Sequence, residues 1–422
     1  MRDTTALAVG SAASGLLAYV FFALSTRTLG AVEAAPVSVL WTYWTFAGAA
    51  LTFPLQHWIS RTAAARDGDG GLRGAMPGVA ALVVVMAVLA AGLSWVIRDP
   101  LFGRDDPGFP LLVGAITLGS GLVGVLRGSL SAQRRFVAVA AAMVLENGLR
   151  CLTAAVLVVG DVASALTVGV CMASGALLCL AWPSAFRFRR EPATRSAGSP
   201  LRFLSGASGG QLLAQTVLTG GPVLLALSGG DAADVTALFV ALALFRAPYL
   251  LAIGLVSPLT GRFTVLFVRG RHRELRRVRM LVLAGTVLTT GAAGTLGALV
   301  GPALLRLVFG DEVHLSAYLT AVVAVGCTTA LASLVITVMI LAQDRSGAVA
   351  RAWSIAVLAG AAVFTLLPAG PLPRTCWAFL SAEAVALVVL VVEELRGSAR
   401  GAATSDGQPS PPGTEGEVGV AG

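Results

Sequence analysis

The apolar residues of this chain occur in long runs, separated by short segments rich in arginine, glycine, proline or acidic residues. Each run is about 18–25 residues long, which is the length of helix that crosses the hydrocarbon core of a bilayer. The pattern therefore predicts an all-α, polytopic membrane protein with twelve transmembrane helices. The predicted spans lie near residues 4–25, 36–58, 75–97, 108–131, 136–158, 162–183, 204–228, 234–257, 280–302, 316–342, 350–368 and 375–394.

Composition supports a membrane protein and excludes a soluble one of this size. Hydrophobic residues make up 56% of the chain and charged residues only 12%, and the mean hydropathy is +0.83. The first apolar run is longer than the core of a signal peptide and has no convincing cleavage signal after it, so we expect it to remain as the first transmembrane helix.

Two short segments recur in the same order in the two halves of the chain. Residues 10–18 (GSAASGLLA) resemble residues 206–214 (GASGGQLLA), and residues 132–135 (AQRR) resemble residues 342–345 (AQDR). An even six-helix repeat relates the halves by an axis along the membrane normal. We therefore predict two six-helix bundles around a central cavity, at residues 1–186 and 204–395, joined by a cytoplasmic linker at 187–203 and followed by a disordered, Gly/Pro/Ser/Glu-rich tail at 396–422.

The arginines are distributed unequally between the two predicted faces of the membrane. The loops after even-numbered spans and the central connection carry most of them, including the run from Arg269 to Arg279, whereas the opposite loops carry few arginines and several acidic residues. By the positive-inside rule this pattern places both termini in the cytoplasm of a bacterial plasma membrane. A juxtamembrane arginine run favours anionic lipid over nucleic acid as its partner.

The cysteines and histidines do not form a recognisable metal or disulfide pattern. The cysteines lie in apolar segments without paired spacing, and the histidines are far apart in sequence. We predict no disulfide framework, no metal site and no cofactor. These residues are Cys151, Cys171, Cys179, Cys327 and Cys376, and His57, His272 and His314.

Arg246 lies in the middle of the eighth predicted span, with more than two apolar turns on each side. A central arginine costs roughly 2.5–3.5 kcal/mol on insertion scales, so something must offset it. Pro248 follows two residues later and cannot donate a hydrogen bond to the carbonyl of Leu244. A cation beside a helix break predicts a residue that lines a water-filled pathway.

Three further charges lie well inside predicted spans, namely Glu146, Arg150 and Glu383. Glu146 and Arg150 are spaced i,i+4 and can form an ion pair on one helical face. One interpretation is that this pair only holds the N-terminal half together; the other is that Arg150 lines the same cavity as Arg246, positioned by Glu146 and Asn147. Glu383 is either the partner of Arg246 or a proton carrier, and both alternatives remain open.

Small and polar residues mark the first and seventh predicted spans. The glycines of residues 10–15 and 206–210, with Gly220, Gly221 and Pro222, predict either close helix packing or bending of gating helices. Gln211 and Gln215 are one turn apart and could hydrogen-bond sugar hydroxyls or, equally, a neighbouring helix.

Three motifs give the chain a family resemblance. They are STRTLG at 25–30 closing the first span, LRGSLSAQRRF at 126–136 between the fourth and fifth spans, and Arg246-Ala-Pro248 with residues 258–262 around the eighth span. The chain resembles, over about residues 5–395, the multidrug/oligosaccharidyl-lipid/polysaccharide (MOP) exporter superfamily in its polysaccharide-biosynthesis, O-antigen-type flippase branch. The resemblance implies two bundles in a V and a cationic cavity that moves a polyprenyl-pyrophosphate-linked glycan to the outer leaflet.

The residues of the chain suit that function. A diphosphate is a multiply charged anion, and the planar fork of arginine supplies charge together with bidentate hydrogen bonds. The candidate head-group residues are Arg246, Arg150 and Arg27, with Gln211 and Gln215. No covalent chemistry is needed, so we do not expect an enzyme. The implied partners are the lipid-linked glycan, membrane lipids and glycan polymerases or glycosyltransferases of the same pathway, without nucleic acid.

Three alternatives carry less weight. A MATE-like multidrug/cation antiporter tends to carry a carboxylate in its first helix, and the predicted first, second and seventh spans contain none. A membrane glycosyltransferase or polymerase normally has large catalytic loops on the outer face, whereas the predicted outer loops of this chain are short. A transport-inactive scaffold would keep the fold and lose the activity.

Overall fold

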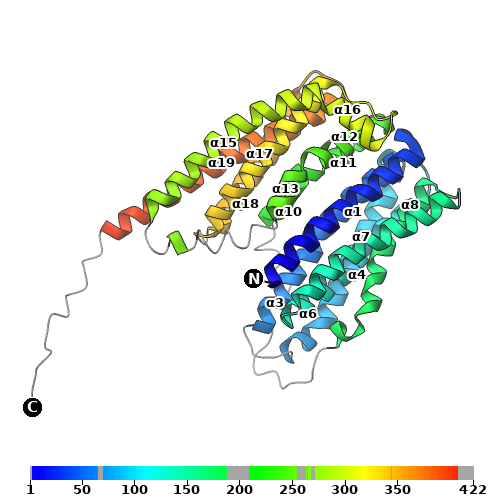
Figure 1. Ribbon diagram of the computed structural model, residues 1–422, viewed down its shortest axis with the longest axis horizontal. Coiled ribbons are helices and arrows are strands. Elements are labelled where there is room, and N and C mark those ends of the chain that lie inside the picture. Colours follow the sequence, from blue (N-terminus) through cyan, green and yellow to red (C-terminus); the bar gives the residue numbers. More distant parts are fainter. Residues whose placement is uncertain are drawn as a thin grey trace, which may run out of the picture.

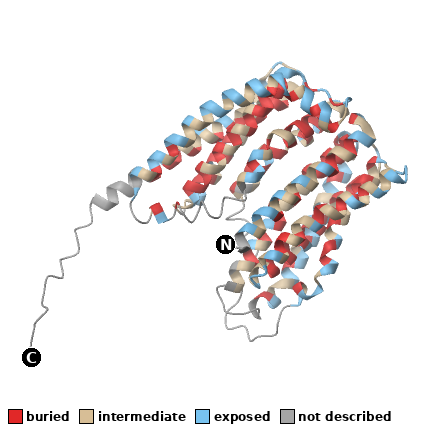
Figure 2. Ribbon diagram, viewed as in Figure 1, coloured by how far each residue is buried: buried red, intermediate tan, exposed pale blue. Residues whose placement is uncertain are grey.

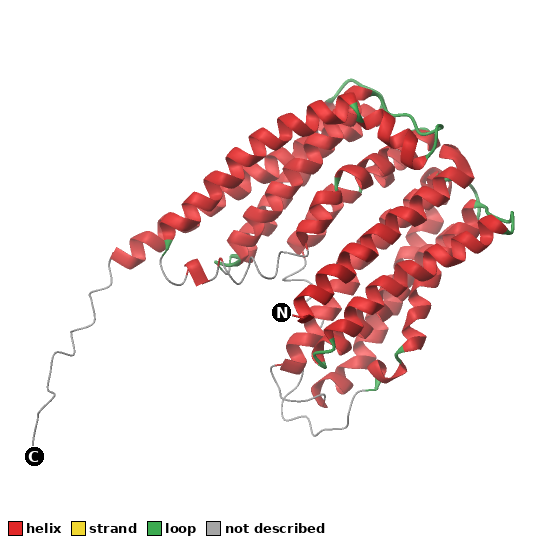
Figure 3. Cartoon of the chain, viewed as in Figure 1, coloured by secondary structure: helices red, strands yellow, loops and turns green. Residues whose placement is uncertain are grey.

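The protein is built from helices (Figure 3). The computed structural model describes residues 2–64, 70–187, 209–253, 263, 265–267, 271–343 and 345–406, and all regular elements in these ranges are helical. The helices form two bundles, one from each half of the chain (Figure 1). This arrangement is the all-α, membrane-spanning fold that the apolar pattern predicts.

The N-terminal bundle is organised around the long pair α1 and α7, with α6 packed against α2, α3, α4 and α8. Its elements are α1 (Arg2–Glu33), α2 (Ala35–Ala47), η1 (Gly48–Thr52), α3 (Phe53–Ala64), α4 (Gly70–Val96), α5 (Arg98–Phe102), α6 (Gly108–Ala132), α7 (Phe136–Val159), α8 (Ala165–Ser174), η2 (Gly175–Ala181) and η3 (Pro183–Phe186).

The C-terminal bundle is organised around α17, which packs between α15 and α19, while α18 packs on α19. Its elements are α10 (Gly209–Thr219), α11 (Gly221–Leu227), α12 (Ala232–Phe245), α13 (Ala247–Ile253), α15 (His272–Leu299), α16 (Gly301–Phe309), α17 (Ala317–Leu341), α18 (Ser346–Leu366) and α19 (Pro371–Asp406).

Eight helices in the described part of the chain are long and apolar enough to cross a membrane, namely those at 5–33, 72–96, 108–132, 136–159, 273–299, 317–341, 346–366 and 371–397. The other four predicted spans are present as interrupted helices. They correspond to α2–η1–α3, α8–η2, α10–α11 and α12–α13.

Some boundaries differ from the sequence prediction. α1 continues past residue 25, with a kink at Gly30, where the backbone is non-helical, before it ends at Glu33. α19 continues to Asp406, so the predicted tail at 396–422 overlaps the end of a helix. Residues 407–422 and all but residue 187 of the predicted linker lie outside the described residues. The added turns are more polar than the spans they extend. A search for apolar runs therefore ends before these turns, although the helix itself continues.

Two of the interruptions follow directly from the sequence. Gly220 separates α10 from α11, whose first turn contains Pro222, and proline is preorganised for a helix start. Arg246 separates α12 from α13, whose first turn contains Pro248, as predicted. A proline cannot donate the hydrogen bond that would continue the preceding helix, so both spans bend where a proline follows.

The two bundles meet near one end of the molecule and diverge toward the end that holds the start of α1 and the end of α19 (Figure 1). α1 contacts α12 and α16 of the other bundle, and α2 contacts α11 and α12. Buried residues gather along the inner faces of the helices, whereas much of α15 is exposed (Figure 2). An exposed apolar helix of this kind is suited to contact with lipid.

Candidate functional site

Arg246 lies at the break between α12 and α13, close to the contact between the two bundles. Its side chain is only 7% exposed, and its guanidinium carbon lies 6.0 Å from the centre of the Phe239 ring. The Nε atom is buried without a hydrogen-bond partner, and no ion pair joins Arg246 to any other described residue. Within the part of the chain that the structure describes, the site therefore holds a buried cation without a counter-ion.

The break also exposes backbone groups to partners from the other bundle. α1 contributes Tyr19, whose hydroxyl donates a hydrogen bond to the carbonyl of Ala243 in the last turn of α12. Tyr19 and Cys327 of α17 both lie within electrostatic reach of Arg246. The Arg246 guanidinium therefore lies near residues of α1 and α17 as well as of its own span.

An aromatic cluster closes the space between the bundles two turns before Arg246 along α12. Phe239 lies 4.2 Å from Phe22 of α1 and 6.4 Å from Trp41 of α2, measured between ring centres. All three side chains are nearly fully buried. Aromatic packing of this density excludes water, so a solute that reached Arg246 would have to arrive from the other side of the cluster.

The second half of α1 makes hydrogen bonds to the C-terminal bundle. Beyond Tyr19, Arg27 donates to the carbonyls of Leu307 and Val308 at the end of α16, the latter over 2.9 Å. The backbone N–H of Ala31 donates to Glu312 and its carbonyl accepts from Thr236. Among the described residues, every such bond involves α1 from Tyr19 onward, so the bundles are joined at the end opposite to the start of α1.

Gly30 of α1 allows a close approach between α1 and Glu312 of the C-terminal bundle. Its φ of 75° lies in the left-handed region, and a Cβ built there would lie 2.3 Å from the Glu312 carboxylate. Glycine is suited to both requirements, since other residues rarely adopt this conformation and would displace Glu312. Arg27, a predicted head-group residue, is thus part of an interhelical contact in this conformation and does not lie beside Arg246.

Glu146 and Arg150 form the predicted ion pair, with Nη2 to Oε1 at 2.8 Å. Sequence reasoning missed the second partner of Glu146, since Arg127 of α6 donates to its other carboxylate oxygen over 2.5 Å. All three side chains are less than 10% exposed. The group contains two arginines and one glutamate, and it joins α6 to α7 inside the N-terminal bundle.

The rest of the Arg150 guanidinium is also engaged. It donates to the carbonyl of Met172 and to the side chain of Asn147, both over 3.0 Å, and it lies 4.3 Å from the centre of the Trp44 ring. Asn147 in turn donates to Ser14 of α1. Each nitrogen of the Arg150 guanidinium therefore donates a hydrogen bond within its own bundle. No recorded contact joins Arg150 or Arg27 to Arg246.

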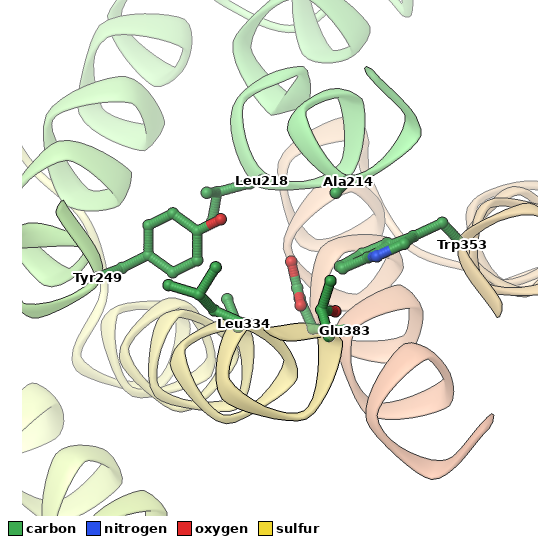
Figure 4. A pocket seen from close by; sticks show the side chains of 8 residues that line it. Ala214, Leu218, Tyr249, Leu334, Trp353 and Glu383 are labelled. Carbon is green, nitrogen blue, oxygen red and sulfur yellow. The ribbon is translucent and has the colours of Figure 1, made fainter. Parts of the chain in front are cut away.

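Glu383 of α19 occupies a small cavity inside the C-terminal bundle. Its side chain is fully buried, and neither carboxylate oxygen has a hydrogen-bond partner among the described residues. Tyr249 of α13 approaches from the opposite side of the cavity (Figure 4). The cavity volume of about 10 Å³ accommodates about one water molecule. No ion pair joins Glu383 to Arg246, although Tyr249 and Cys327 lie within electrostatic reach of both.

We expect Glu383→Gln to leave the melting temperature of the purified protein unchanged or raise it, because the substitution removes a buried carboxylate that has no hydrogen-bond partner in the described structure. The matched control is Glu394→Gln, about three turns further along the same helix. The carboxylate of Glu394 is also fully buried, and it pairs with Arg279 over 2.5 Å. That control should lower the melting temperature, because it leaves Arg279 without its counter-ion. A loss at Glu383 as large as at Glu394 would show that Glu383 has a cationic partner.

The remaining predicted residues lie in the helices expected for them. Gln215 is buried in α10 without a side-chain hydrogen bond to another described residue, and the side chain of Gln211 lies outside the described residues. Close packing is evident at Gly10, where an added Cβ would lie 2.7 Å from Ala140, while Gly15 has open space around it. Gly10 therefore fits close packing and Gly220 lies at a helix break, whereas bending of gating helices stays a prediction.

No family model and no curated protein matches this chain. Several solved structures match the chain. An inward-facing multidrug resistance MATE family transporter of the MOP superfamily matches with a TM-score of 0.69 at 14% identity, covering 97% of this chain and 99% of that one. The lipid II flippase MurJ, in an inward closed conformation, matches with a TM-score of 0.69 at 12% identity, covering 96% and 93%.

An outward-facing MATE family transporter matches with a TM-score of 0.60 at 14% identity, covering 96% of this chain and 97% of that one. These similarities establish that the chain has the fold of MATE and MOP transporters, as expected from the sequence. The likeness covers both MATE transporters and MurJ, so it does not choose between branches of the superfamily.

Proposed function

We propose that this protein is a membrane flippase that moves a polyprenyl-pyrophosphate-linked oligosaccharide, or a related cell-surface glycan precursor, across the bacterial plasma membrane by alternating access. The observation that carries the proposal is the buried Arg246, which has no anionic partner among the described residues and lies at a helix break beside the contact between the bundles. An unpaired cation in that place is suited to an anionic head group.

The divergence of the two bundles fits one of the two states of an alternating-access cycle, the state that is open at one side of the membrane. The aromatic cluster of Phe22, Trp41 and Phe239 and the hydrogen bonds from α1 hold the bundles together at one end, while the opposite end is spread (Figure 1). A diphosphate head group would reach Arg246 from the spread end, and its lipid tail would remain in the bilayer between the bundles. The return state requires the contacts of Arg27, Ala31 and Phe239 to separate.

The proposed head-group site consists of Arg246, with Gln211 and Gln215 as candidates for sugar hydroxyls. Arg150 and Arg27 are engaged by other groups in this conformation, so we assign them to structure and to the contact between bundles. Pathway enzymes such as a glycan polymerase or glycosyltransferases are the expected partners. Glu383, which is fully buried and has no partner in the described ranges, is the candidate coupling group, because a carboxylate in this setting can exchange a proton or cation during the cycle.

Glu383 is also the observation that favours a second candidate function, a MATE-like multidrug/cation antiporter. Glu33, at the far end of α1, pairs with Arg104 near the surface and does not supply a carboxylate at depth. A cation antiporter would therefore depend on Glu383 alone among these residues, whereas a flippase depends on Arg246.

The two functions separate in one experiment. The purified protein is reconstituted into vesicles with either a fluorescent lipid-linked diphosphate oligosaccharide or the lipophilic cation ethidium, and movement of each is followed. We expect the lipid-linked glycan to become accessible to a membrane-impermeant reagent on the far side, with no ethidium transport. Ethidium transport without glycan movement would establish the antiporter, and movement of neither would establish a transport-inactive scaffold.

We further propose that both termini are cytoplasmic, since the exposed arginines at the spread end, such as Arg134 and Arg135, outnumber their acidic neighbours, while Arg98 and Arg104 at the other end pair with Asp105 and Glu33.

Orientation is tested with two single cysteines that flank α7, introduced into a cysteine-free background. Val162→Cys lies in an exposed loop at one end of the helix and Arg135→Cys at the other. We expect an impermeant maleimide added to intact cells to label position 162 and to leave position 135 unlabelled until the membrane is opened. The reverse pattern would show that the proposed orientation is inverted.

A further inference from the structure

A second cavity, much larger than the one beside Glu383, lies away from the contact between the bundles. It is a groove of about 820 Å³ on the N-terminal bundle, formed by α4, α6 and the end of η3. α4 packs against α3, α5 and α6, all of the same bundle, and side chains such as Val84 and Leu122 are 50% and 41% exposed. A groove with exposed apolar walls on a membrane helix opens toward the acyl chains of the bilayer.

The groove has a cationic mouth and an apolar interior. Arg73 near the start of α4 and Arg187 after η3 lie at one end, and both are exposed. Neither arginine forms an ion pair or side-chain hydrogen bond with another described residue. The remaining lining is apolar, from Met76 and Ala80 down to Val84. Two free guanidinium groups above an apolar channel match an anionic head group above an acyl chain.

The length of the groove fits one leaflet. From Arg73 to Val84 the α4 axis rises by about 16 Å at ~1.5 Å per residue, and half of a hydrocarbon core of ~30 Å is about 15 Å. The arginines would therefore lie at the phosphate level when the deepest wall of the groove lies near the bilayer midplane. A cavity of this volume falls within the range of about 300–1,000 Å³ that is usual for small-ligand sites.

We propose that this groove is a binding site for one anionic glycerophospholipid of the surrounding membrane, with its phosphate between Arg73 and Arg187 and an acyl chain along α4 and α6. Arg187 is the last residue described before the connection to the second bundle, whereas Arg73 belongs to α4. A bound phosphate thus links the end of the N-terminal bundle to α4. The site is separate from Arg246, and the proposal does not depend on the transported substrate.

The test compares lipid retention by the full-length protein in detergent, measured by native mass spectrometry with phosphatidylglycerol and phosphatidylcholine of the same acyl chains. We expect phosphatidylglycerol to be retained in preference to phosphatidylcholine. Arg73→Gln/Arg187→Gln should weaken phosphatidylglycerol retention by about thirtyfold, since each interfacial arginine contributes about fivefold. The matched control, Arg134→Gln/Arg135→Gln, removes two exposed arginines from the loop between α6 and α7, which do not line the groove, and should change retention by less than about twofold.

A second variant tests the apolar part of the groove with both arginines present. Ala80→Trp fills the groove from the exposed face of α4, and it should reduce retention of phosphatidylglycerol while leaving the elution volume of the protein unchanged. Equal losses for the two double-arginine variants, or equal retention of the two phospholipids, would overturn the proposal. Displacement of phosphatidylglycerol by an equimolar polyprenyl phosphate would also overturn it, because the groove would then bind the carrier lipid of the substrate.

Discussion

Arg246→Ala is expected to abolish most movement of the lipid-linked glycan while leaving the protein at least as stable as the wild type. A charge-assisted hydrogen bond to phosphate contributes roughly 1.5–3 kcal/mol, or about ten- to hundredfold in affinity, and a bidentate contact contributes more. Stability should not fall, because Arg246 has no ion-pair partner among the described residues and its burial in a membrane costs roughly 2.5–3.5 kcal/mol. Activity and stability should therefore move in opposite directions.

The measurements are glycan movement in vesicles and the melting temperature in detergent. Arg246→Lys keeps the charge and loses the planar fork, so it should retain partial activity. The matched control is Arg306→Ala, which removes an exposed arginine of the same bundle whose one hydrogen bond to a described residue is to the carbonyl of Pro302, and it should change neither quantity. If Arg246→Ala lowers the melting temperature and a second substitution at Glu383 restores it, Arg246 is a structural ion-pair residue and the head-group assignment is wrong.

The membrane fold was predictable because its main determinant is local. Apolar runs long enough to cross a bilayer can be identified in the amino-acid sequence itself. The helix breaks at Gly220 and Arg246 are each followed by a proline. Prolines also follow the π-helical turn η1 and the 3₁₀ helix η2, at Pro54 and Pro183, but a proline does not specify whether the turn before it is α, π or 3₁₀. These two irregular turns coincide with tertiary contacts, since Thr52 bonds to the carbonyl of Ser120 and Gly175 accommodates the Arg150 side chain.

The candidate site was predictable only in its separate parts. Sequence spacing identified the Glu146–Arg150 pair, because residues four apart share a helical face. It could not identify Arg127, which reaches Glu146 from another helix, nor could it show that Arg27 contacts α16. These partners depend on the packing of helices that are distant in sequence. The unpaired state of Glu383 likewise depends on the whole C-terminal bundle, so the alternatives left open by the sequence needed the structure.

The shared role of Glu146 changes the experiment that the sequence alone would suggest. If Glu146 and Arg150 were a simple pair, exchanging the two residues would preserve the fold. In the structure an arginine at position 146 would face Arg127, and a glutamate at position 150 would face the carbonyl of Met172 and the Trp44 ring. The exchange should therefore destabilise the bundle whether or not Arg150 has a role in transport, and it cannot separate the two interpretations.

Glu146→Gln is the more informative substitution and is expected to lower the free energy of unfolding by about 3–5 kcal/mol, because it leaves two buried arginines without their shared counter-ion. The control Asp105→Asn removes one partner of the exposed Arg98–Asp105 pair and should cost only about 0–1 kcal/mol. In an Arg127→Met background the cost of Glu146→Gln should be smaller, because one of the two stranded charges is already absent and the contacting residues are coupled. Equal costs in the two backgrounds would show that Arg127 does not share the charge of Glu146, and the three-residue group would then reduce to the Glu146–Arg150 pair within α7.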